Sequence, residues 1–248
     1  MKYLHLIIAI VLPLSLLSCA HKSGHVKKDN MTPMTYDNNR NGNSHNLQVV
    51  VTNNRGESNK MSGADIFKKY NTAVFMVFTT DGFNSYQGSG FFVNSSGLAV
   101  SNYHVFQGTN IGGECIKLPN RNETHKVVEV IHKDSDEDFI LFRVDVTDTN
   151  YIPIAKYKPS IGERVFAIGS PRGLENTFSS GEVSQWRDTN VMQISALIDH
   201  GSSGGALINE YGEVVGITSG TFAEGSQANL NYAWSIDVIK PYVNSNDK

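Results

Sequence analysis

The feature that most constrains the fold of this chain is the regular spacing of its apolar runs after residue 62. Short runs rich in Val, Ile, Phe and Tyr alternate with turn-forming clusters of Gly, Asn, Asp and Ser, and almost no helical periodicity separates them. The strands that this spacing predicts are residues 72–80, 85–94, 98–106, 114–119, 125–132, 139–145, 163–169, 177–187, 191–197, 205–209, 213–219 and 231–235. Short, evenly spaced strands indicate an all-β fold of antiparallel barrels or a sandwich rather than βαβ units.

Helices are expected only at the two ends of this β-rich region. Residues 65–70 can form a short helix, and residues 235–243 can form another with Ser235 as its N-cap. A seam near residues 148–157 divides the strands between them into two halves of similar size. No internal repeat is visible in the residues themselves.

Composition excludes several classes of function. Lys and Arg number 21 and Asp and Glu number 24, so the formal net charge is −3 and no positive excess is available for nucleic-acid phosphates. The two cysteines allow at most one disulfide and no zinc ribbon. We therefore predict no nucleic-acid partner, no metal and no cofactor, and a fold that depends on its hydrophobic core.

The first residues indicate a targeting signal rather than a structural element. Residues 1–18 resemble a secretion signal, and Leu16–Cys19 resembles a bacterial lipobox, in which cleavage precedes the cysteine and lipid is attached to its thiol. Residues 19–62 are polar and lack periodicity, which predicts a disordered tether before a folded domain at 63–248. An acylated Cys19 would hold the protein at a lipid bilayer of the bacterial cell envelope, at the outer membrane or facing the periplasm in a Gram-negative cell. Soluble secretion with an incidental cysteine is the alternative.

The segment Gly201–Gly205 is the first candidate for chemistry. A serine nucleophile needs an exposed hydroxyl on a tight turn, with backbone N–H groups free to hold an oxyanion, and flanking glycines permit that close approach. Ser203 is therefore the candidate nucleophile, and the N–H groups of Gly201 and Ser203 are the candidate oxyanion donors.

A serine hydroxyl needs a base, and histidine is the side chain suited to that task near neutral pH. His125 and His132 fall among charged residues and are predicted to face solvent, whereas His200 lies on the same turn as Ser203. His104 ends a strongly apolar predicted strand, which makes it the better candidate. A hydrogen-bonded core histidine is the alternative role for His104.

The base must itself be oriented by an acid. Asp138 opens the apolar run 138–144, whereas Asp134 and Asp136 lie in a more polar turn where solvation is their expected role. The candidates then follow the order His104, Asp138 and Ser203, with separations of 34 and 65 residues.

Five segments together resemble a known family. They are Gly88–Val93, Asn102–Val105, Asp138–Leu141, Gly201–Leu207 and Gly212–Ile217. As a set they look like a chymotrypsin-fold serine protease, and they are most similar to the protease domain of the bacterial Deg/HtrA family over about residues 64–243. The resemblance implies two six-stranded antiparallel β-barrels, about residues 64–148 and 152–243, with catalytic residues in the cleft between them.

The resemblance also implies roles for individual residues. Ser203 would attack the peptide carbonyl, His104 would carry the proton, and Asp138 would orient His104 with support from the hydroxyl of Ser219. The segment Ser219, Gly220 and Thr221 would pair with the substrate backbone as an added strand.

The chain also departs from well-known members of the superfamily. Leu197 occupies the position where trypsin-like enzymes carry an acidic residue, and Ile198 follows it, which predicts an apolar primary pocket for small or medium aliphatic side chains. No PDZ domain is expected after Lys248. Cys115 is predicted to be a small buried hydrophobe.

These observations predict a serine endopeptidase that cleaves envelope or extracellular polypeptides through an acyl-enzyme, with no oligomeric state predicted. A catalytically silent, peptide-binding member of the same fold is the alternative. An esterase of the α/β-hydrolase fold is disfavoured, because that fold runs Ser, Asp, His along the chain and alternates strands with helices.

Overall fold

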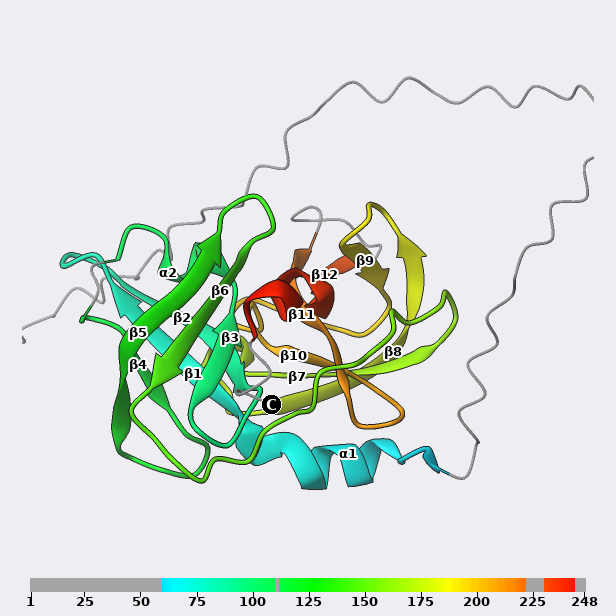
Figure 1. Ribbon diagram of the computed structural model, residues 1–248, viewed down its shortest axis with the longest axis horizontal. Coiled ribbons are helices and arrows are strands. Elements are labelled where there is room, and N and C mark those ends of the chain that lie inside the picture. Colours follow the sequence, from blue (N-terminus) through cyan, green and yellow to red (C-terminus); the bar gives the residue numbers. More distant parts are fainter. Residues whose placement is uncertain (1–58, 110–111, 222–229, 244–248) are drawn as a thin grey trace, which may run out of the picture. The chain divides into compact units, whose positions relative to one another are not determined.

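The computed structural model describes residues 59–109, 112–221 and 230–243 (Figure 1). All of them belong to one compact unit of the chain. The predicted signal peptide, the predicted lipidation site Cys19 and the predicted tether up to residue 58 lie outside the described residues. The last residues of the predicted tether, 59–62, are instead part of the folded domain, where the N–H of Met61 donates to the carbonyl of Glu210. Within the described ranges, none of the helices is both long enough and apolar enough to cross a membrane.

The described strands form two closed barrels, each of six strands (Figure 1). Barrel 1 contains β1 (Val74–Thr80), β2 (Ser85–Phe92), β3 (Leu98–Ser101), β4 (Cys115–Lys117), β5 (Thr124–Asp134) and β6 (Phe139–Val144), in the closed order β1-β2-β3-β6-β5-β4. Barrel 2 contains β7 (Arg164–Gly169), β8 (Thr177–Trp186), β9 (Val191–Ile194), β10 (Ala206–Asn209), β11 (Val214–Thr221) and β12 (Asn231–Ser235), in the closed order β10-β11-β12-β9-β8-β7. The predicted all-β fold of two six-stranded antiparallel barrels is confirmed. Both barrels have the same connectivity although their sequences show no repeat.

Short helices flank the barrels at both ends of the described chain. Helix α1 (Gly63–Tyr70) begins after Ser62, whose hydroxyl accepts a hydrogen bond from the N–H of Asp65, and it leads into the 3₁₀ turn η2 (Asn71–Ala73). The last element is the 3₁₀ helix η4 (Ile236–Tyr242), capped by Ser235 as predicted. The 3₁₀ turn η3 (Pro171–Gly173) follows β7.

One predicted strand is wrong in its second half. The strand predicted at 98–106 ends at Ser101, and the chain then forms the helical turn α2 (Tyr103–Phe106). A strand alternates its side chains between two faces, so it would turn either Val105 or Phe106 to the outside. The helical turn instead buries both adjacent side chains in the core of barrel 1.

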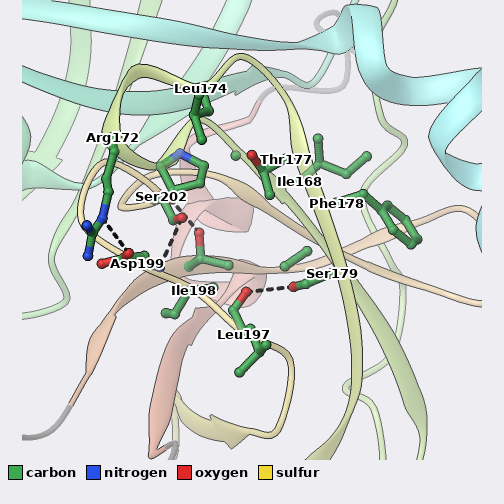
Figure 2. Close-up of a pocket in the computed structure, with 14 residues that line it drawn as sticks. Ile168, Arg172, Leu174, Thr177, Phe178, Ser179, Leu197, Ile198, Asp199 and Ser202 are labelled. Atoms are coloured by element: carbon green, nitrogen blue, oxygen red, sulfur yellow. Dashed lines mark hydrogen bonds and ion pairs between the residues drawn. The ribbon is translucent and has the colours of Figure 1, made fainter.

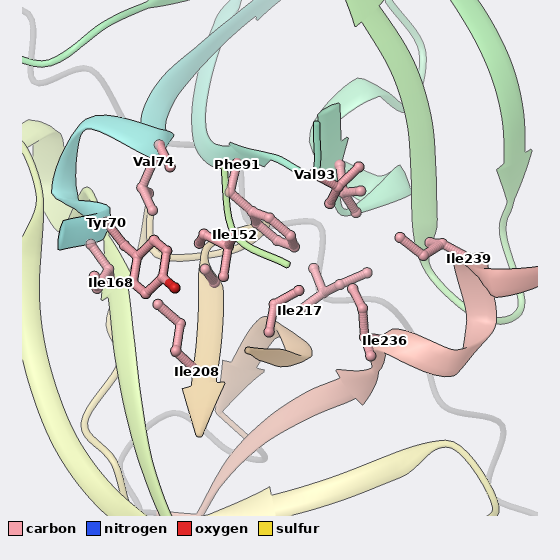
Figure 3. Packing of buried hydrophobic residues seen from close by; sticks show 14 of the residues in the cluster. Tyr70, Val74, Phe91, Val93, Ile152, Ile168, Ile208, Ile217, Ile236 and Ile239 are labelled. Carbon is pink, nitrogen blue, oxygen red and sulfur yellow. The ribbon is translucent and has the colours of Figure 1, made fainter. Parts of the chain in front are cut away.

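A hydrophobic cluster shared by both barrels fixes how they pack (Figure 3). Barrel 1 contributes Phe91 from β2, and barrel 2 contributes Ile168, Ile208 and Ile217. Ile152, from the segment that connects the barrels, lies among them and is fully buried. Because this cluster excludes water between the barrels, side chains carried by different barrels hold a defined relative position.

Candidate active site

The imidazole of His104 and the carboxylate of Asp138 form a hydrogen-bonded pair. His104 lies in α2 and Asp138 immediately precedes β6, and the Nδ1 atom of His104 is 2.9 Å from Oδ2 of Asp138 and 3.1 Å from Oδ1. The backbone N–H of His104 also donates to Oδ1 of Asp138, at 2.9 Å. The side chains remain 28% and 16% exposed, respectively, so the pair lies at the surface of a largely buried site.

Asp138 adopts an uncommon backbone conformation that its neighbours stabilise. Its φ is +44°, in the left-handed region that non-glycine residues adopt rarely. The side-chain amide of Asn102 donates to the carbonyl of Asp138 at 2.8 Å, and the hydroxyl of Ser219 donates to Oδ2 at 2.9 Å. Asn102 thus holds the backbone of Asp138, while the carboxylate accepts bonds from His104 of barrel 1 and Ser219 of barrel 2 and is held against the imidazole.

The hydroxyl of Ser203 lies close to this pair but is not bonded to it. Ser203 Oγ donates to the backbone carbonyl of Ser219 at 2.6 Å. Ser219 therefore contacts both Asp138 and Ser203, which brings all three predicted residues to one place. Among the described residues, no hydrogen bond joins Ser203 to His104, which is the contact that a serine nucleophile requires.

Ser219 reaches both partners because β11 is irregular at this point. The pairing of β11 with β12 shifts register between Thr218 and Gly220, which leaves Ser219 as an extra residue in the strand. Such bulges bend a strand and redirect a side chain. The sequence resemblance predicts the hydroxyl contact of Ser219, but its carbonyl contact with Ser203 has no sequence signal.

The backbone turn before Ser203 leaves two N–H groups without partners in the described structure. The carbonyl of His200 accepts a hydrogen bond from the N–H of Arg172 at 2.7 Å. The carbonyl of Ser202 accepts one from the hydroxyl of Thr218, also at 2.7 Å. Because a trans peptide is planar, its N–H points away from its own carbonyl. Because the carbonyls of His200 and Ser202 point toward Arg172 and Thr218, the N–H groups of the following residues, Gly201 and Ser203, point away from those two residues.

Comparison with known proteins assigns this arrangement to a family. The model of the trypsin-like peptidase domain matches residues 88–217, a stretch that includes His104, Asp138 and Ser203. This chain belongs to the trypsin-like peptidase family.

Relatives within this family include Deg- and HtrA-type proteases. The chain is 26% identical to protease Do-like 1, chloroplastic, of Arabidopsis thaliana over 217 residues, which cover 77% of this chain and 48% of that protein. It is 36% identical to a probable periplasmic serine endoprotease, DegP-like, of Pseudomonas savastanoi over 169 residues, covering 63% and 34% of the two chains. The crystal structure of the serine endoprotease from Yersinia pestis superimposes with a TM-score of 0.65 at 26% identity, covering 73% of this chain and 65% of that one. The chain thus spans between about a third and a half of the length of these curated relatives.

The other histidines of this trypsin-like domain have different surroundings. His132 is not solvent-facing as predicted, because its ring stacks on Tyr242 with the ring centroids 3.6 Å apart. His125 is also half-buried. Each lies on β5, an 11-residue strand along which exposed and partly buried side chains are mixed. His200 is exposed, on the turn next to Ser203, as the sequence suggested.

The structure also shows the surroundings of Asp134, predicted to be solvated, and of Cys115, predicted to be buried. The carboxylate of Asp134 accepts hydrogen bonds from the N–H groups of Asp136 and Glu137, so it stabilises the turn before Asp138. Cys115 is half-buried rather than buried, because side chains alternate along β4 and Cys115 lies on the face opposite the fully buried Ile116. Burial nevertheless raises the pKa of the Cys115 thiol.

The residues predicted to form the primary pocket line a cavity of about 430 Å³ (Figure 2). Its walls include Leu174, Phe178, Leu197, Ile198, Ser202 and Thr218. His104, Asp138 and Ser203 are not among its lining residues. The cavity adjoins Ser202, the residue before the candidate nucleophile, and extends toward the segment after β7. Leu197, which is 60% exposed, and Ile198 thus line an apolar space next to residues 199–204, which carry the candidate nucleophile and are called the catalytic turn below.

An ion pair closes one side of this cavity (Figure 2). The Nε atom of Arg172 is 2.7 Å from Oδ2 of Asp199. Burial acts to raise the pKa of Asp199, but the N–H of His200 and the guanidinium of Arg172 outweigh it and hold the pKa below its ordinary value. Arg172 thus contacts the catalytic turn twice, through this ion pair and through its N–H to His200.

The remaining predicted substrate-binding residues lie in β11. Gly220 has open space where a side chain would project, and Thr221 ends the strand. The side chain of Thr221 lies outside the described part of the structure. Sequence reasoning missed Asn102, Arg172 and Thr218 as supports of the site, because each acts through a residue distant in sequence.

Proposed function

We propose that this chain is a serine endopeptidase that hydrolyses peptide bonds through an acyl-enzyme formed on Ser203. The observation that carries the proposal is the contact of Ser219 with both Asp138 and Ser203, which joins the hydroxyl to a carboxylate–imidazole pair only 2.9 Å apart. Membership of the trypsin-like peptidase family supports the reaction class.

Catalysis requires the hydroxyl of Ser203 to change its partner. We expect rotation about the Cα–Cβ bond to move Oγ from the carbonyl of Ser219 to Nε2 of His104 when substrate binds. Catalytic hydrogen bonds are often long in a protein without substrate and shorten when substrate binds. The Nδ1–H of His104 donates to Asp138, so Nε2 is left as the acceptor in the neutral ring.

Acylation and deacylation both pass one proton through His104. His104 Nε2 takes the proton of Ser203 as Oγ bonds to the substrate carbonyl carbon, and the N–H groups of Gly201 and Ser203 stabilise the resulting oxyanion. His104 returns that proton to the leaving amine, the C–N bond breaks, and an ester remains on Ser203. Water then attacks the ester, gives a proton to His104, and releases the acid while Ser203 recovers its hydrogen.

The proposed substrates are polypeptides that bind in extended form. Residues Ser219–Thr221 would pair with the substrate backbone, and Leu197 and Ile198 would favour small or medium aliphatic side chains before the cleaved bond. The apolar cavity beside these two residues supports that preference. Mapping the cut sites in a peptide library tests it, and a majority of cuts after Arg or Lys would contradict it.

Fluorophosphonate labelling of the purified chain tests the activity itself. The wild-type chain should react at Ser203 and hydrolyse peptides, whereas Ser203→Ala and His104→Ala should each lower turnover by roughly 10⁴- to 10⁶-fold, because triad members act as a unit. Thermal unfolding of both variants provides the control, since neither side chain contributes to a hydrophobic core. A folded wild-type chain that binds peptides but resists labelling would establish the catalytically silent alternative.

The proposed location is the bacterial cell envelope, where an acylated Cys19 would hold the chain at a bilayer. The name of the DegP-like relative of Pseudomonas savastanoi, a probable periplasmic serine endoprotease, supports an envelope location. Cys19→Ser should release the protein into the soluble fraction while leaving peptide kinetics unchanged. An unchanged membrane fraction would disprove lipidation at this residue.

A further inference from the structure

Ser89 is a fully buried residue of barrel 1 whose polar atoms are bonded to both barrels. Its hydroxyl donates to the carbonyl of Gly201 at 2.7 Å and accepts from the N–H of Ser170 at 2.8 Å. Its N–H donates to the carbonyl of Ser203 at 2.8 Å, and its carbonyl accepts from the hydroxyl of Ser101 at 2.7 Å. Three of these four bonds reach barrel 2, which is unusual for a residue in the middle of a barrel 1 strand.

These contacts hold the two residues that carry the candidate oxyanion donors. The backbone of each donor residue is held at two carbonyls, that of the preceding residue and its own. Barrel 2 holds the preceding carbonyls, through the N–H of Arg172 and the hydroxyl of Thr218. Ser89 holds the following carbonyls, those of Gly201 and Ser203, so the orientation of both donors depends on a residue of the opposite barrel.

The packing around Ser89 leaves little room for an alternative arrangement. A Cβ atom on Gly204 would lie 2.2 Å from the carbonyl oxygen of Ser89 and 2.3 Å from the hydroxyl of Ser101. A Cβ atom on Gly169 would lie 3.3 Å from the hydroxyl of Ser89. The catalytic turn therefore rests directly on β2, and the hydroxyl of Ser89 makes its bonds across a closely packed junction.

We propose that Ser89 is a positioning residue that sets the geometry of the oxyanion site across the barrel interface. Its hydroxyl fixes the peptide after Gly201 and the segment at Ser170, and its backbone fixes Ser203. This inference rests on the proposed peptidase function, because the donors matter only if an oxyanion forms. Ser89 contacts the two residues that carry the oxyanion donors, so its loss should affect the transition state more than substrate binding.

Ser89→Ala in the full chain tests this role. The variant keeps the backbone bond to Ser203 but loses the hydroxyl bonds to Gly201 and Ser170. Complete loss of one oxyanion donor costs about 100- to 1,000-fold in kcat, so misalignment of a donor should lower kcat by about 10- to 100-fold. KM for the same peptide should stay within about threefold, because ground-state binding does not use the donors.

A peptidyl trifluoromethyl ketone gives a second readout that a purely structural role would not change. Its adduct with Ser203 places an oxyanion between the donors, so its inhibition constant should weaken by the same factor as kcat/KM falls. The affinity of the corresponding cleaved peptide acid, which forms no adduct, should stay within threefold. A trifluoromethyl ketone that binds wild type and variant equally well would overturn the proposal.

Ser235→Ala is the matched control. Ser235 is the same residue type, is buried, and its hydroxyl accepts a hydrogen bond from the N–H of Asp237 at the start of η4 rather than contacting Ser89 or the catalytic turn. It should lower the melting temperature while leaving kcat within twofold. If Ser89→Ala does not fold, Ser89→Cys keeps a side-chain donor at this position, which is weaker and slightly larger than the hydroxyl, and should still lower kcat at unchanged KM.

The outcomes separate this inference from the proposed function. A wild-type chain that neither reacts with fluorophosphonate nor hydrolyses peptides contradicts the peptidase proposal. An active wild type whose folded Ser89→Ala or Ser89→Cys variant keeps kcat within twofold contradicts the positioning role alone.

Discussion

The two barrels have the same strand order but differ in their cores and in what they bring to the site. The core of barrel 1 contains an aromatic group in which Phe75 contacts Phe92 and Phe142, and Phe142 contacts Phe106. The corresponding core of barrel 2 is built mainly from Val, Ile, Leu and Ala side chains. Barrel 1 carries the candidate base and acid, whereas barrel 2 carries the candidate nucleophile and the oxyanion donors.

The two halves of the site also differ in how they are held. His104 and Asp138 are bonded to each other within barrel 1, where Asn102 also donates to the backbone carbonyl of Asp138, and the pair takes only the hydroxyl of Ser219 from barrel 2. The turn of Ser203 instead depends on both barrels, through Arg172 on one side and Ser89 on the other. The acid–base half of the site, His104 and Asp138, is thus held mostly within barrel 1. The nucleophile half, the turn of Ser203, is held by contacts that form only when the two barrels pack together.

The largest effect that separates the halves is expected within the acid–base pair. Asp138→Asn should lower kcat by about 10⁴-fold, because an amide favours the wrong imidazole tautomer. Ser219→Ala removes one hydrogen bond to the carboxylate and should cost about tenfold. Peptide kinetics of both variants measure this ratio, and equal losses would contradict a barrel 1 pair that is mostly self-supported.

The junction between the halves should be sensitive to a single methyl group. Gly204→Ala should destabilise the fold by about 3 kcal/mol, because the new Cβ contacts β2 and the residue has a φ of +86°. Gly220→Ala is the control, since nothing lies within 4 Å of its added Cβ and its φ is not positive. Chemical denaturation measures the difference, and similar stability of the two variants would show that the turn can move away from β2.

Activity at different pH values distinguishes the two halves by their chemistry. Peptidase activity should be lower at acidic pH, because a histidine base that already carries a proton cannot accept one from Ser203. Ser89→Ala changes only the nucleophile half, so it should lower the plateau without moving the profile. A flat profile in the wild-type chain would contradict a histidine base.

The smallest effect is expected from an ion pair that joins the barrels at the surface. Lys117 of β4 pairs with Glu175 near η3, and this hydrogen bond, with a second from the N–H of Asn120, lowers the pKa of Glu175. A lowered pKa means that the pair stabilises the fold at neutral pH and loses that contribution as the pH falls and the carboxylate gains a proton. Glu175→Gln should therefore cost less than about 1 kcal/mol at pH 7.

Denaturation at two pH values completes this test. The difference between wild type and Glu175→Gln should shrink as the pH falls to about 3, below the ordinary pKa of a glutamate. A difference that is constant with pH would show that the pair contributes through packing rather than charge.

The secondary structure was largely predictable because it is encoded locally. Alternating apolar residues and turn-forming clusters predict strands wherever the backbone can bury one face, and all the described strands lie within or close to the predicted ranges. The prediction failed at residues 102–106, where the need to bury both Val105 and Phe106 outweighs the strand preference of an apolar run. The solvent-facing prediction failed at His132 because Tyr242, more than a hundred residues later, covers its ring.

The sequence alone determined the fold class and nominated the chemistry, because strand periodicity and the types of residue around Ser203 are properties of short segments. Only the tertiary structure decided which contacts those residues make. The hydroxyl of Ser203 donates to a carbonyl of β11, and the catalytic turn is hydrogen-bonded to Ser89, which is separated from Gly201 by 112 residues. Such contacts arise from the closure and packing of two barrels, and no pattern within a few residues encodes a distance across that interface.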